Sequence, residues 1–463
     1  MDRIQAAIES LEKAGPNAQQ CPLRPQYHLL APAFWINDPN GTIYHDGMYH
    51  VFYQHNPYKN KWGSIHWGHA RSEDLIHWEH LPVALAPSKE EGEKHCFSGC
   101  CVIHEGTPKI LYTKIGGIRD VFRGAEQWLA LGDDELISWT KHPENPVMDD
   151  GIHGEEKVRQ WRDPYAWKEG DKWYCVIGGH YKWRLHGAVY LYESSDLVNW
   201  KYLHPLYEGK LGQGWIFECP NFFQLNDKHV LVLSPRGKVI YSVGEYSKHK
   251  FRPNGWHHLD HGEAFYATNT LTDDKGRTIL FGWIKGGGKG WNGCMSLPRV
   301  LRLSGEGGLK VQPAKELTDL REGLIHEDHF TLKPGMKKPI HDEGKKGVEV
   351  ELNFSFPGNA RAGFSLLNCK KRPSLGFDGK KGLLFLGKET GKMRKNSMRE
   401  RNTLRIFLDN SVVEMFLNER ECFTGHFYPQ HEEEVQLSMF CEREKVHVES
   451  IKVWTMSSIW GGP

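Results

Sequence analysis

The segment Ser72–Trp78, with the sequence SEDLIHW, returns twice further along the chain, as DDELISW in residues 133–139 and as SDLVNW in residues 195–200. Each copy ends in a tryptophan, and these tryptophans follow one another at an even spacing of about 60 residues, with Trp256 next in the series. Short runs rich in aromatic and β-branched residues surround the copies and predict strands. Evenly spaced strands in units of this length are typical of β-propeller blades. We therefore predict five blades, the last and shortest running from Phe265 to Leu303.

The chain of 463 residues exceeds what one hydrophobic core usually holds, so more than one domain is expected. Its first residues, MDRIQAAIESLEKAG, carry apolar side chains at helical spacing and predict a short amphipathic helix. After Pro313 the pattern changes to a short helical link in residues 314–321, followed by basic, glycine-rich strands. We predict an all-β chain with four parts: an N-terminal helical extension (1–24), a five-bladed β-propeller (25–312), a linker (313–325) and a structural C-terminal domain of strands (326–463).

The composition argues against polyanionic partners. Lysine and arginine number 59 and aspartate and glutamate 58, so neither nucleic acid nor an anionic membrane is an expected partner, and self-association is left open. The N-terminus lacks the apolar core of a signal peptide, and no run of about 18 apolar residues is present. Ten scattered cysteines predict free thiols. We expect a cytoplasmic protein, although a secreted protein whose signal peptide had been removed would have the same N-terminus.

Three acidic residues lie about 40 residues before three of the four tryptophans: Asp38, Asp163 and Glu218. The first strand of each propeller blade lines the central channel, so the three carboxylates are predicted to converge there. An aromatic residue precedes each acid and a proline follows within two residues. The alternative is a repeated turn at the start of each blade, without chemistry, because Asn, Asp, Pro and Gly also build ordinary turns. Carboxylates gathered in a cavity repel one another, a cost usually tolerated for function.

Paired carboxylates across a scissile bond are the tools of a glycosidase, one acting as acid and the other as nucleophile or base. Amides near Asp38, such as that of Asn37, are expected to keep it ionised, as a nucleophile must be. The apolar neighbours of Glu218 are expected to raise its pKa, so that it holds the proton of a general acid. Arg162 is expected to lower the pKa of Asp163, which then suits hydrogen bonding to sugar hydroxyls.

The motifs WINDPNG (35–41), WRDP (161–164) and FECP (217–220), in this order, resemble the three signature motifs of glycoside hydrolase family 32, which contains invertases, sucrose-6-phosphate hydrolases, inulinases and levanases. Further segments resemble this family at matching places: Tyr53-Gln54, Phe97-Ser98-Gly99, Leu297-Pro298-Arg299, Leu404–Asp409 and Val413–Phe416. Each motif alone is weak, but three in order at the same place in the repeat are specific. The resemblance covers nearly the whole chain.

The resemblance implies a five-bladed propeller followed by a β-sandwich, and retaining hydrolysis of terminal β-D-fructofuranosides. It implies that Asp38 is the nucleophile, Glu218 the acid/base, and Asp163 the residue that grips fructose hydroxyls in the transition state. The implied substrate-binding residues are Asn37, Gln54, Trp62, Phe97, Ser98, Arg162, Cys219, Tyr266 and Trp283. The expected substrate is sucrose, a phosphorylated sucrose or a fructo-oligosaccharide, with no cofactor and no metal ion.

Two alternatives stay open at this point. A fructosyltransferase would share every catalytic residue and differ only in whether water or a sugar accepts the fructosyl group, and a catalytically inactive carbohydrate-binding propeller is disfavoured by the intact acids. Within WINDPNG, the residues Pro39-Asn40-Gly41 are expected to turn the chain sharply behind Asp38. Two positions depart from the family pattern: Cys100, where serine is common, and Ala264, where aspartate is usual.

Overall fold

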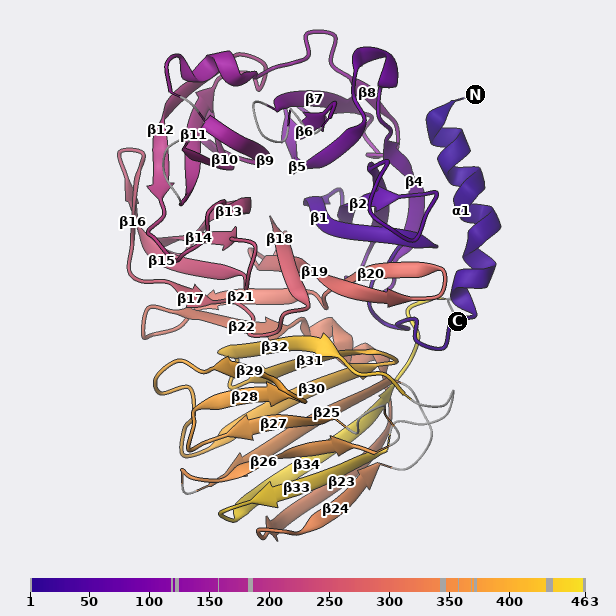
Figure 1. Ribbon diagram of the computed structural model, residues 1–463, viewed down its shortest axis with the longest axis vertical. Helices are drawn as coiled ribbons and strands as arrows, with labels where there is room; N and C mark the ends of the chain where they lie inside the picture. Colours follow the sequence, from indigo (N-terminus) through magenta and orange to yellow (C-terminus); the bar gives the residue numbers. More distant parts are fainter. Residues whose placement is uncertain are drawn as a thin grey trace.

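The computed structural model describes residues 2–117, 120, 125–156, 158–181, 186–341, 347–356, 358–367, 369, 373–429 and 436–460. Strands make up most of this part of the chain (Figure 1), which confirms the prediction of a nearly all-β protein. Within these described residues there are also three short 3₁₀ helices, namely η1 (Lys89–Glu91), η2 (Asp150–His153) and η3 (Lys315–Leu320). The last of these confirms the predicted helical link.

The N-terminal helix, α1 (Arg3–Gln19), packs beside β4 (Glu79–Leu85) at the edge of the molecule (Figure 1). Its N-cap is Asp2, whose carboxylate accepts a hydrogen bond from the N–H of Ile4 at 3.1 Å. The helix continues beyond its predicted end, past Pro16 to Gln19, because its last turn buries Ala18 against the fold. No helix within the described residues combines the length and the apolar character needed to cross a membrane.

The N-terminal unit, residues 34–313, contains four sheets. Nine strands form the first sheet in the order β22-β21-β19-β20-β1-β2-β3-β4, with β18 paired to β19. Their bounds are β1 (Phe34–His45), β2 (Met48–Asn56), β3 (His66–Ser72), β4 (Glu79–Leu85), β18 (Phe265–Thr272), β19 (Thr278–Gly288), β20 (Trp291–Met295), β21 (Arg299–Leu303) and β22 (Leu309–Pro313). The chain's first and last strands of this unit therefore share one sheet.

The other three sheets of this unit follow the order of the chain. The second contains β5 (His95–His104), β6 (Thr107–Ile115), β7 (Glu126–Gly132) and β8 (Trp139–Lys141). The third contains β9 (Val158–Glu169), β10 (Lys172–Tyr181), β11 (Gly187–Ser194) and β12 (Trp200–Glu208). The fourth contains β13 (Glu218–Leu225), β14 (Lys228–Ser234), β15 (Ile240–Ser247), β16 (Lys250–Pro253) and β17 (His257–His258).

The strands β1, β5, β9, β13 and β18 lie nearest the centre of the N-terminal unit (Figure 1). They contact one another in a closed ring, β1 with β5, β5 with β9, β9 with β13, β13 with β18 and β18 with β1. Further strands extend outward from each of them. Apolar side chains fill the space between neighbouring sheets, as where Val176 of β10 packs in one cluster with Phe222 of β13 and Leu231 of β14. Side chains on the inner strands therefore point toward a common region.

The repeated segment forms the same turn in all three copies. In the first copy, Asp74 Oδ1 accepts hydrogen bonds from the N–H groups of Ile76 at 3.0 Å and His77 at 2.8 Å, and Trp78 Nε1 donates to the carbonyl of Leu75 at 3.1 Å. The matching indole bonds run from Trp139 to Leu136 and from Trp200 to Leu197, both at 2.9 Å. Each turn joins the third and fourth strands of its group. The sequence repeat is thus a structural repeat.

The C-terminal unit, residues 321–456, consists of two six-stranded sheets (Figure 1). One contains β23 (Arg321–Leu332), β34 (Val446–Met456), β25 (Gly347–Ser355), β30 (Asn402–Asp409), β31 (Val412–Leu417) and β32 (Glu421–His426). The other contains β24 (Lys337–His341), β33 (Leu437–Glu442), β26 (Arg361–Leu366), β27 (Ser374–Asp378), β28 (Leu383–Leu386) and β29 (Glu389–Lys392). Buried side chains from both sheets form one core, among them Ile406 and Met415 from the first and Phe364 from the second. β23 begins at Arg321, within the range predicted as linker.

A buried network of charges joins the two units. Arg299 Nη1 lies 2.9 Å from Asp260 Oδ2, and Arg299 Nη2 lies 2.5 Å from Glu414 Oε2. On the other side of Glu414, the ring of His28 lies between Glu414 Oε1 at 3.2 Å and Asp409 Oδ2 at 2.7 Å. All five side chains are fully buried. Removing one partner would leave a buried charge uncompensated, at a cost of about 3–5 kcal/mol.

The charge of His28 depends on this network. Burial disfavours the charged ring, but the hydrogen bonds and charges of Asp409 and Glu414 outweigh it and raise the pKa of His28 to about 9. An unfolded histidine titrates near pKa 6.5, to within about one unit. The folded state therefore binds this proton more tightly. The stabilisation is complete below about pH 6.5 and is lost as the pH rises toward about 9.

We expect the free energy of unfolding to fall by about 3 kcal/mol between about pH 6 and pH 9 through His28 alone. The variant His28→Gln should be less stable at pH 6 and should lose this part of the pH dependence, because glutamine cannot carry the proton. Urea unfolding of both proteins at three pH values in this window measures the difference. Parallel pH profiles for the two proteins would contradict the assignment.

Candidate active site

The segment WINDPNG lies inside β1 and not in a turn. Ile36 pairs with His55 of β2 and Pro39 pairs with Tyr53, so Asn37 and Asp38 together face one residue of β2 and form a β-bulge. The predicted sharp turn at residues 39–41 is therefore wrong. A proline is tolerated in a strand at an edge or a bulge, and the register at this place shows the bulge.

The other inner strands also have a bulge beside predicted site residues. The register shifts fall at Phe97-Ser98 in β5, at Asp163-Pro164 in β9, at Cys219-Pro220 in β13 and at Ala267, next to Tyr266, in β18. Strict alternation would send neighbouring side chains to opposite faces of a sheet, and a bulge redirects them. This explains how the adjacent residues Arg162 and Asp163 both reach the region between the inner strands.

Asp38 is held by hydrogen-bond donors from three different strands. Asn37 Nδ2 lies 3.1 Å from Asp38 Oδ1, Gln54 Nε2 lies 3.3 Å from Oδ2, and Ser98 Oγ lies 2.6 Å from Oδ2. The donors also support one another, because Asn37 Nδ2 donates to Gln54 Oε1 at 2.9 Å. The carboxylate is thus fixed in one orientation. Three predicted substrate-binding residues, Asn37, Gln54 and Ser98, act here as supports of an acid.

Glu218, the first residue of β13, is held by side chains from the neighbouring sheets. Arg162 Nη2 lies 2.6 Å from Glu218 Oε1, and the hydroxyl of Tyr266 lies 2.5 Å from Oε2. Arg236 Nε lies 3.5 Å from the same Oε2. The side chain of Glu218 is 16% exposed, so its carboxylate is accessible from solvent.

Asp163 is linked to the other two acids through Cys219. Its Oδ2 accepts a hydrogen bond from the N–H of Cys219 at 2.9 Å. The thiol of Cys219 lies 3.4 Å from Asp38 Oδ2 and 3.6 Å from Asp163 Oδ2, so this one residue touches two of the acids and directly follows Glu218. The structure therefore brings together the three carboxylates that the sequence placed in one phase of the repeat.

The protonation of the acids differs from the sequence-based expectation. Burial raises the pKa of Asp163 to about 7, although Arg162 opposes it. Burial also acts to raise the pKa of Glu218, but Arg162 and Tyr266 outweigh it and hold that pKa below its usual value. The predicted low pKa of Asp163 and the predicted high pKa of Glu218 are therefore wrong for the ligand-free protein. The reason is that the guanidinium of Arg162 pairs across the sheets with Glu218, and the apolar neighbour Phe217 packs into a separate core.

Asp38 shows the same influence of burial. Its pKa is raised above the usual value by burial, with the hydrogen bonds of Ser98 and Asn37 opposing and the charge of Glu218 adding to the rise. The expected hydrogen bonds from amides to Asp38 are thus present, but they do not outweigh the rise in pKa that burial causes. In the absence of a ligand, a proton at this site resides more readily on Asp163 than on Glu218.

Aromatic rings stand around the acids. Trp62 is 48% exposed, and its ring lies 4.9 Å from that of His95 and 6.1 Å from that of Phe97. On another side, Trp283 meets Trp35 edge to face at 5.6 Å. Flat rings with an exposed face are suited to packing against the apolar faces of sugars.

Three further residues of the site were missed by the sequence analysis. Trp35 Nε1 donates to Asn37 Oδ1 at 2.7 Å, which fixes the amide that supports Asp38. Arg236 reaches Glu218 from the segment between β14 and β15, and no sequence signal points to it. Lys285 Nζ lies 4.3 Å from the centre of the Tyr266 ring. Lys285 could have been found, because it lies two residues after Trp283 in one strand and therefore on the same face.

The two departures from the family pattern have different surroundings. The thiol of Cys100 accepts a hydrogen bond from the N–H of Ala166 at 3.3 Å and packs between two sheets, away from the acids. The carbonyl of Ala264 accepts a hydrogen bond from the N–H of Lys285 at 2.8 Å. The change at Ala264 therefore lies next to the cation at the rim of the site.

The chain matches two protein-family models. Residues 28–313 match the N-terminal domain of glycosyl hydrolases family 32, and residues 316–455 match the C-terminal domain of the same family. Among curated proteins, it is 32% identical to a sucrose-6-phosphate hydrolase of Escherichia coli, over 93% of this chain and 94% of the relative. It is 30% identical to a levanase of Bacillus subtilis, over 95% of this chain and 71% of the relative.

Solved structures give the same result. Fructan 1-exohydrolase IIa from Cichorium intybus superimposes with a TM-score of 0.83 at 28% identity, covering 94% of this chain and 98% of that one. A GH32 β-fructofuranosidase of Bombyx mori superimposes with a TM-score of 0.81 at 28% identity, covering 99% of both chains. The two matched family domains, the full-length relatives and the three converging acids lead to one conclusion: this chain belongs to glycosyl hydrolase family 32.

Proposed function

We propose that the N-terminal unit is a five-bladed β-propeller and that the C-terminal unit is a β-sandwich. The closed ring of contacts among the five inner strands, each with further strands extending outward, supports the propeller. Two sheets that enclose one apolar core support the sandwich. The two family matches meet between residues 313 and 316, which supports a division of the chain at the proposed linker.

We propose that the protein is a β-fructofuranosidase that hydrolyses terminal β-D-fructofuranosyl bonds in sucrose or related fructosides. The observation that carries this function is the pair Asp38 and Glu218, which lie on inner strands of different sheets and are each oriented by fixed donors. The named activities of the relatives, a sucrose-6-phosphate hydrolase and a levanase, agree on fructosyl bonds. The ten cysteines, all free and buried, fit a cytoplasmic location.

In the proposed mechanism Asp38 attacks the anomeric carbon while Glu218 gives a proton to the leaving oxygen, and water then releases the fructosyl group from Asp38 with Glu218 as base. Asp163 accepts hydrogen bonds from fructose hydroxyls. Those hydroxyls, on binding, stabilise the ionised forms of Asp163 and Asp38 and so favour transfer of the shared proton to Glu218. Substrate binding itself thus prepares the acid.

The anomeric configuration of the first fructose released should show whether hydrolysis retains or inverts configuration. A double displacement through Asp38 retains configuration, so the first fructose released should be the β-furanose form. NMR spectra recorded in the first minutes after mixing with sucrose, before the sugar equilibrates, measure this. Release of the α-furanose form first would rule out a covalent fructosyl group on Asp38. Accumulation of fructosyl-sucrose products at high sucrose concentration would instead favour the transferase alternative.

The roles of the two acids should separate on substrates with different leaving groups. Asp38→Asn should lower kcat by about ten-thousandfold or more on every substrate, because no covalent intermediate can form. Glu218→Gln should do the same on sucrose but retain much of the activity on a fructoside with an acidic aryl leaving group, which needs little protonation. The surface variant Glu73→Gln is the matched control and should behave as wild type. An equal loss on both substrates in Glu218→Gln would count against its role as acid.

Asp163 should set the basic limb of the pH profile. Its pKa is raised to about 7 in the free protein, and its proton is the one that passes to Glu218 on substrate binding, so kcat/KM should fall as the pH rises above about 7 and this group loses its proton. In Asp163→Asn the plateau value of kcat should be lower by roughly a hundredfold, with little change in KM. This limb of the pH profile should disappear. Initial rates on sucrose from pH 4.5 to pH 9 check both statements. A large rise in KM with unchanged kcat would make Asp163 an ordinary binding residue.

A further inference from the structure

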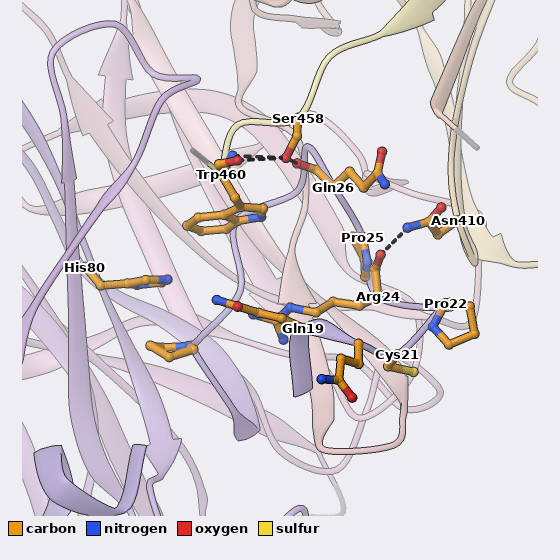
Figure 2. Close-up of a pocket in the computed structure, with 12 residues that line it drawn as sticks. Gln19, Cys21, Pro22, Arg24, Pro25, Gln26, His80, Asn410, Ser458 and Trp460 are labelled. Atoms are coloured by element: carbon orange, nitrogen blue, oxygen red, sulfur yellow. Dashed lines mark hydrogen bonds between the residues drawn. The ribbon is translucent and has the colours of Figure 1, made fainter. Parts of the chain in front are cut away.

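A hollow of about 630 Å³ lies where the two units, the C-terminal end of α1 and the last described residues meet (Figure 2). Its volume is within the range of small-molecule sites in proteins. Twelve residues line it: Gln19, Gln20, Cys21, Pro22, Arg24, Pro25, Gln26, Pro32, His80, Asn410, Ser458 and Trp460. None of them belongs to the candidate active site.

Arg24 is the one lining residue with a permanent charge, and it is 7% exposed. Its Nη2 donates to the carbonyl of Ala31 at 2.8 Å, and its Nη1 has no hydrogen-bond partner. No carboxylate among the described residues pairs with this guanidinium. Burial accordingly lowers the pKa of Arg24 to about 10. A buried cation without a counter-ion is costly, since buried charges are normally paired.

Three other polar atoms at this hollow also lack hydrogen-bond partners among the described residues, namely Trp460 Nε1, Asn410 Oδ1 and His80 Nδ1. His80 stacks on Trp460 with ring centres 4.9 Å apart and an angle of 12° between the rings. Burial, together with the charge of Arg24, lowers the pKa of His80 to about 4, so His80 adds no second cation near neutral pH. In Figure 2 the Arg24 side chain extends toward the side of the hollow where His80 and Trp460 lie.

We propose that this hollow binds a small oxyanion carried on a hydroxylated carbon skeleton, as in a sugar phosphate or a sugar acid. The oxyanion supplies the counter-ion that Arg24 lacks among the described residues, because a guanidinium is the side chain best suited to phosphate and carboxylate. A hydroxyl of the ligand donates to Asn410 Oδ1, and the indole N–H of Trp460 is a further donor. Water satisfies single polar atoms but does not supply the negative charge that Arg24 lacks.

The ligand would connect parts of the chain that are far apart in sequence. The lining residues come from the end of α1, the segment before β1, strand β4, the turn between β30 and β31, and the last described residues. A ligand that binds only the folded state stabilises a protein by an amount that grows with the logarithm of the ligand concentration once this exceeds Kd. The two units and the end of α1 should therefore separate less readily when the site is filled.

Calorimetric titration at constant ionic strength tests the proposal, with four probes: glucose 6-phosphate, gluconate, inorganic phosphate and glucose. We expect one or both hydroxylated anions to bind at least tenfold more tightly than glucose and than inorganic phosphate. The two anions distinguish a phosphate from a carboxylate ligand. The variant His80→Glu brings a carboxylate to Arg24 and should abolish this binding while raising the melting temperature of the free protein. Gln5→Glu, on α1 but outside the hollow, is the matched control and should bind as wild type.

Two further variants keep the test informative if His80→Glu does not fold. Gln20→Glu supplies the carboxylate from the exposed end of α1, and Arg24→Lys keeps the charge but not the planar fork, so each should weaken binding by tenfold or more. Binding of inorganic phosphate as tight as that of glucose 6-phosphate would overturn the hydroxylated part of the proposal. Absence of binding by both hydroxylated anions, or unchanged binding in His80→Glu and Gln20→Glu, would overturn the site itself, because a ligand bound among the catalytic acids would be unaffected by these changes.

Discussion

Convergence of five bulged strands on one centre is the constraint on which the site depends. A regular strand directs neighbouring side chains to opposite faces, so it could present Asp163 or Arg162 to the centre but not both. The extra residue in β9 removes this restriction, and the extra residues in β1 and β5 do the same for Asn37-Asp38 and Phe97-Ser98. The inner strands therefore combine two roles: they build the ring and they aim the polar groups.

The electrostatics of the site follow from this convergence. Three carboxylates in one buried region repel one another, and burial by itself raises the pKa of each. Arg162 outweighs burial only at Glu218, because its guanidinium reaches across to β13 and bonds that carboxylate. At Asp163 the charge of Arg162 opposes burial without outweighing it, and the hydrogen bonds come from the N–H and thiol of Cys219. In the ligand-free protein this difference between the acids is the reverse of what the proposed roles need, because Glu218 has to give a proton and Asp38 has to act as a nucleophile; substrate binding has to invert it.

The sequence predicted the parts of the fold that repeat. The even spacing of tryptophans indicated equivalent strands, and in each copy of the repeated turn an aspartate accepts hydrogen bonds from the two backbone N–H groups that precede the tryptophan. Asp38, Asp163 and Glu218 occupy the same position in that repeat, and this was enough to predict that they lie close together. Pairing between side chains was not predictable in this way, because it depends on which sheets become neighbours. Arg162 stands beside Asp163 in the chain and yet pairs with Glu218.

The bulges were beyond sequence reasoning for a similar reason. Proline and glycine in WINDPNG signal an irregular backbone, and a turn and a bulge use the same residues. Only the partner strand decides between them, and β2 continues to pair with β1 through Pro39. Lys285 shows the opposite case: the sequence analysis missed it, although alternation from Trp283 along one strand would have been sufficient to place it.

The C-terminal unit supports the site although it carries none of the acids. Asp409 of β30 accepts hydrogen bonds from the backbone N–H groups of Gln26 at 2.7 Å, Tyr27 at 2.9 Å and His28 at 3.1 Å. These residues precede β1 by a few positions, so the carboxylate fixes the path by which the chain enters the strand that carries Asp38. The same carboxylate and Glu414 hold the charged His28, and Glu414 also holds Arg299 at the other end of the N-terminal unit. Because β1 and β21 belong to one sheet, a single buried network of the C-terminal unit holds both the chain that enters β1, the first strand of the ring, and the strand β21 near the end of the N-terminal unit.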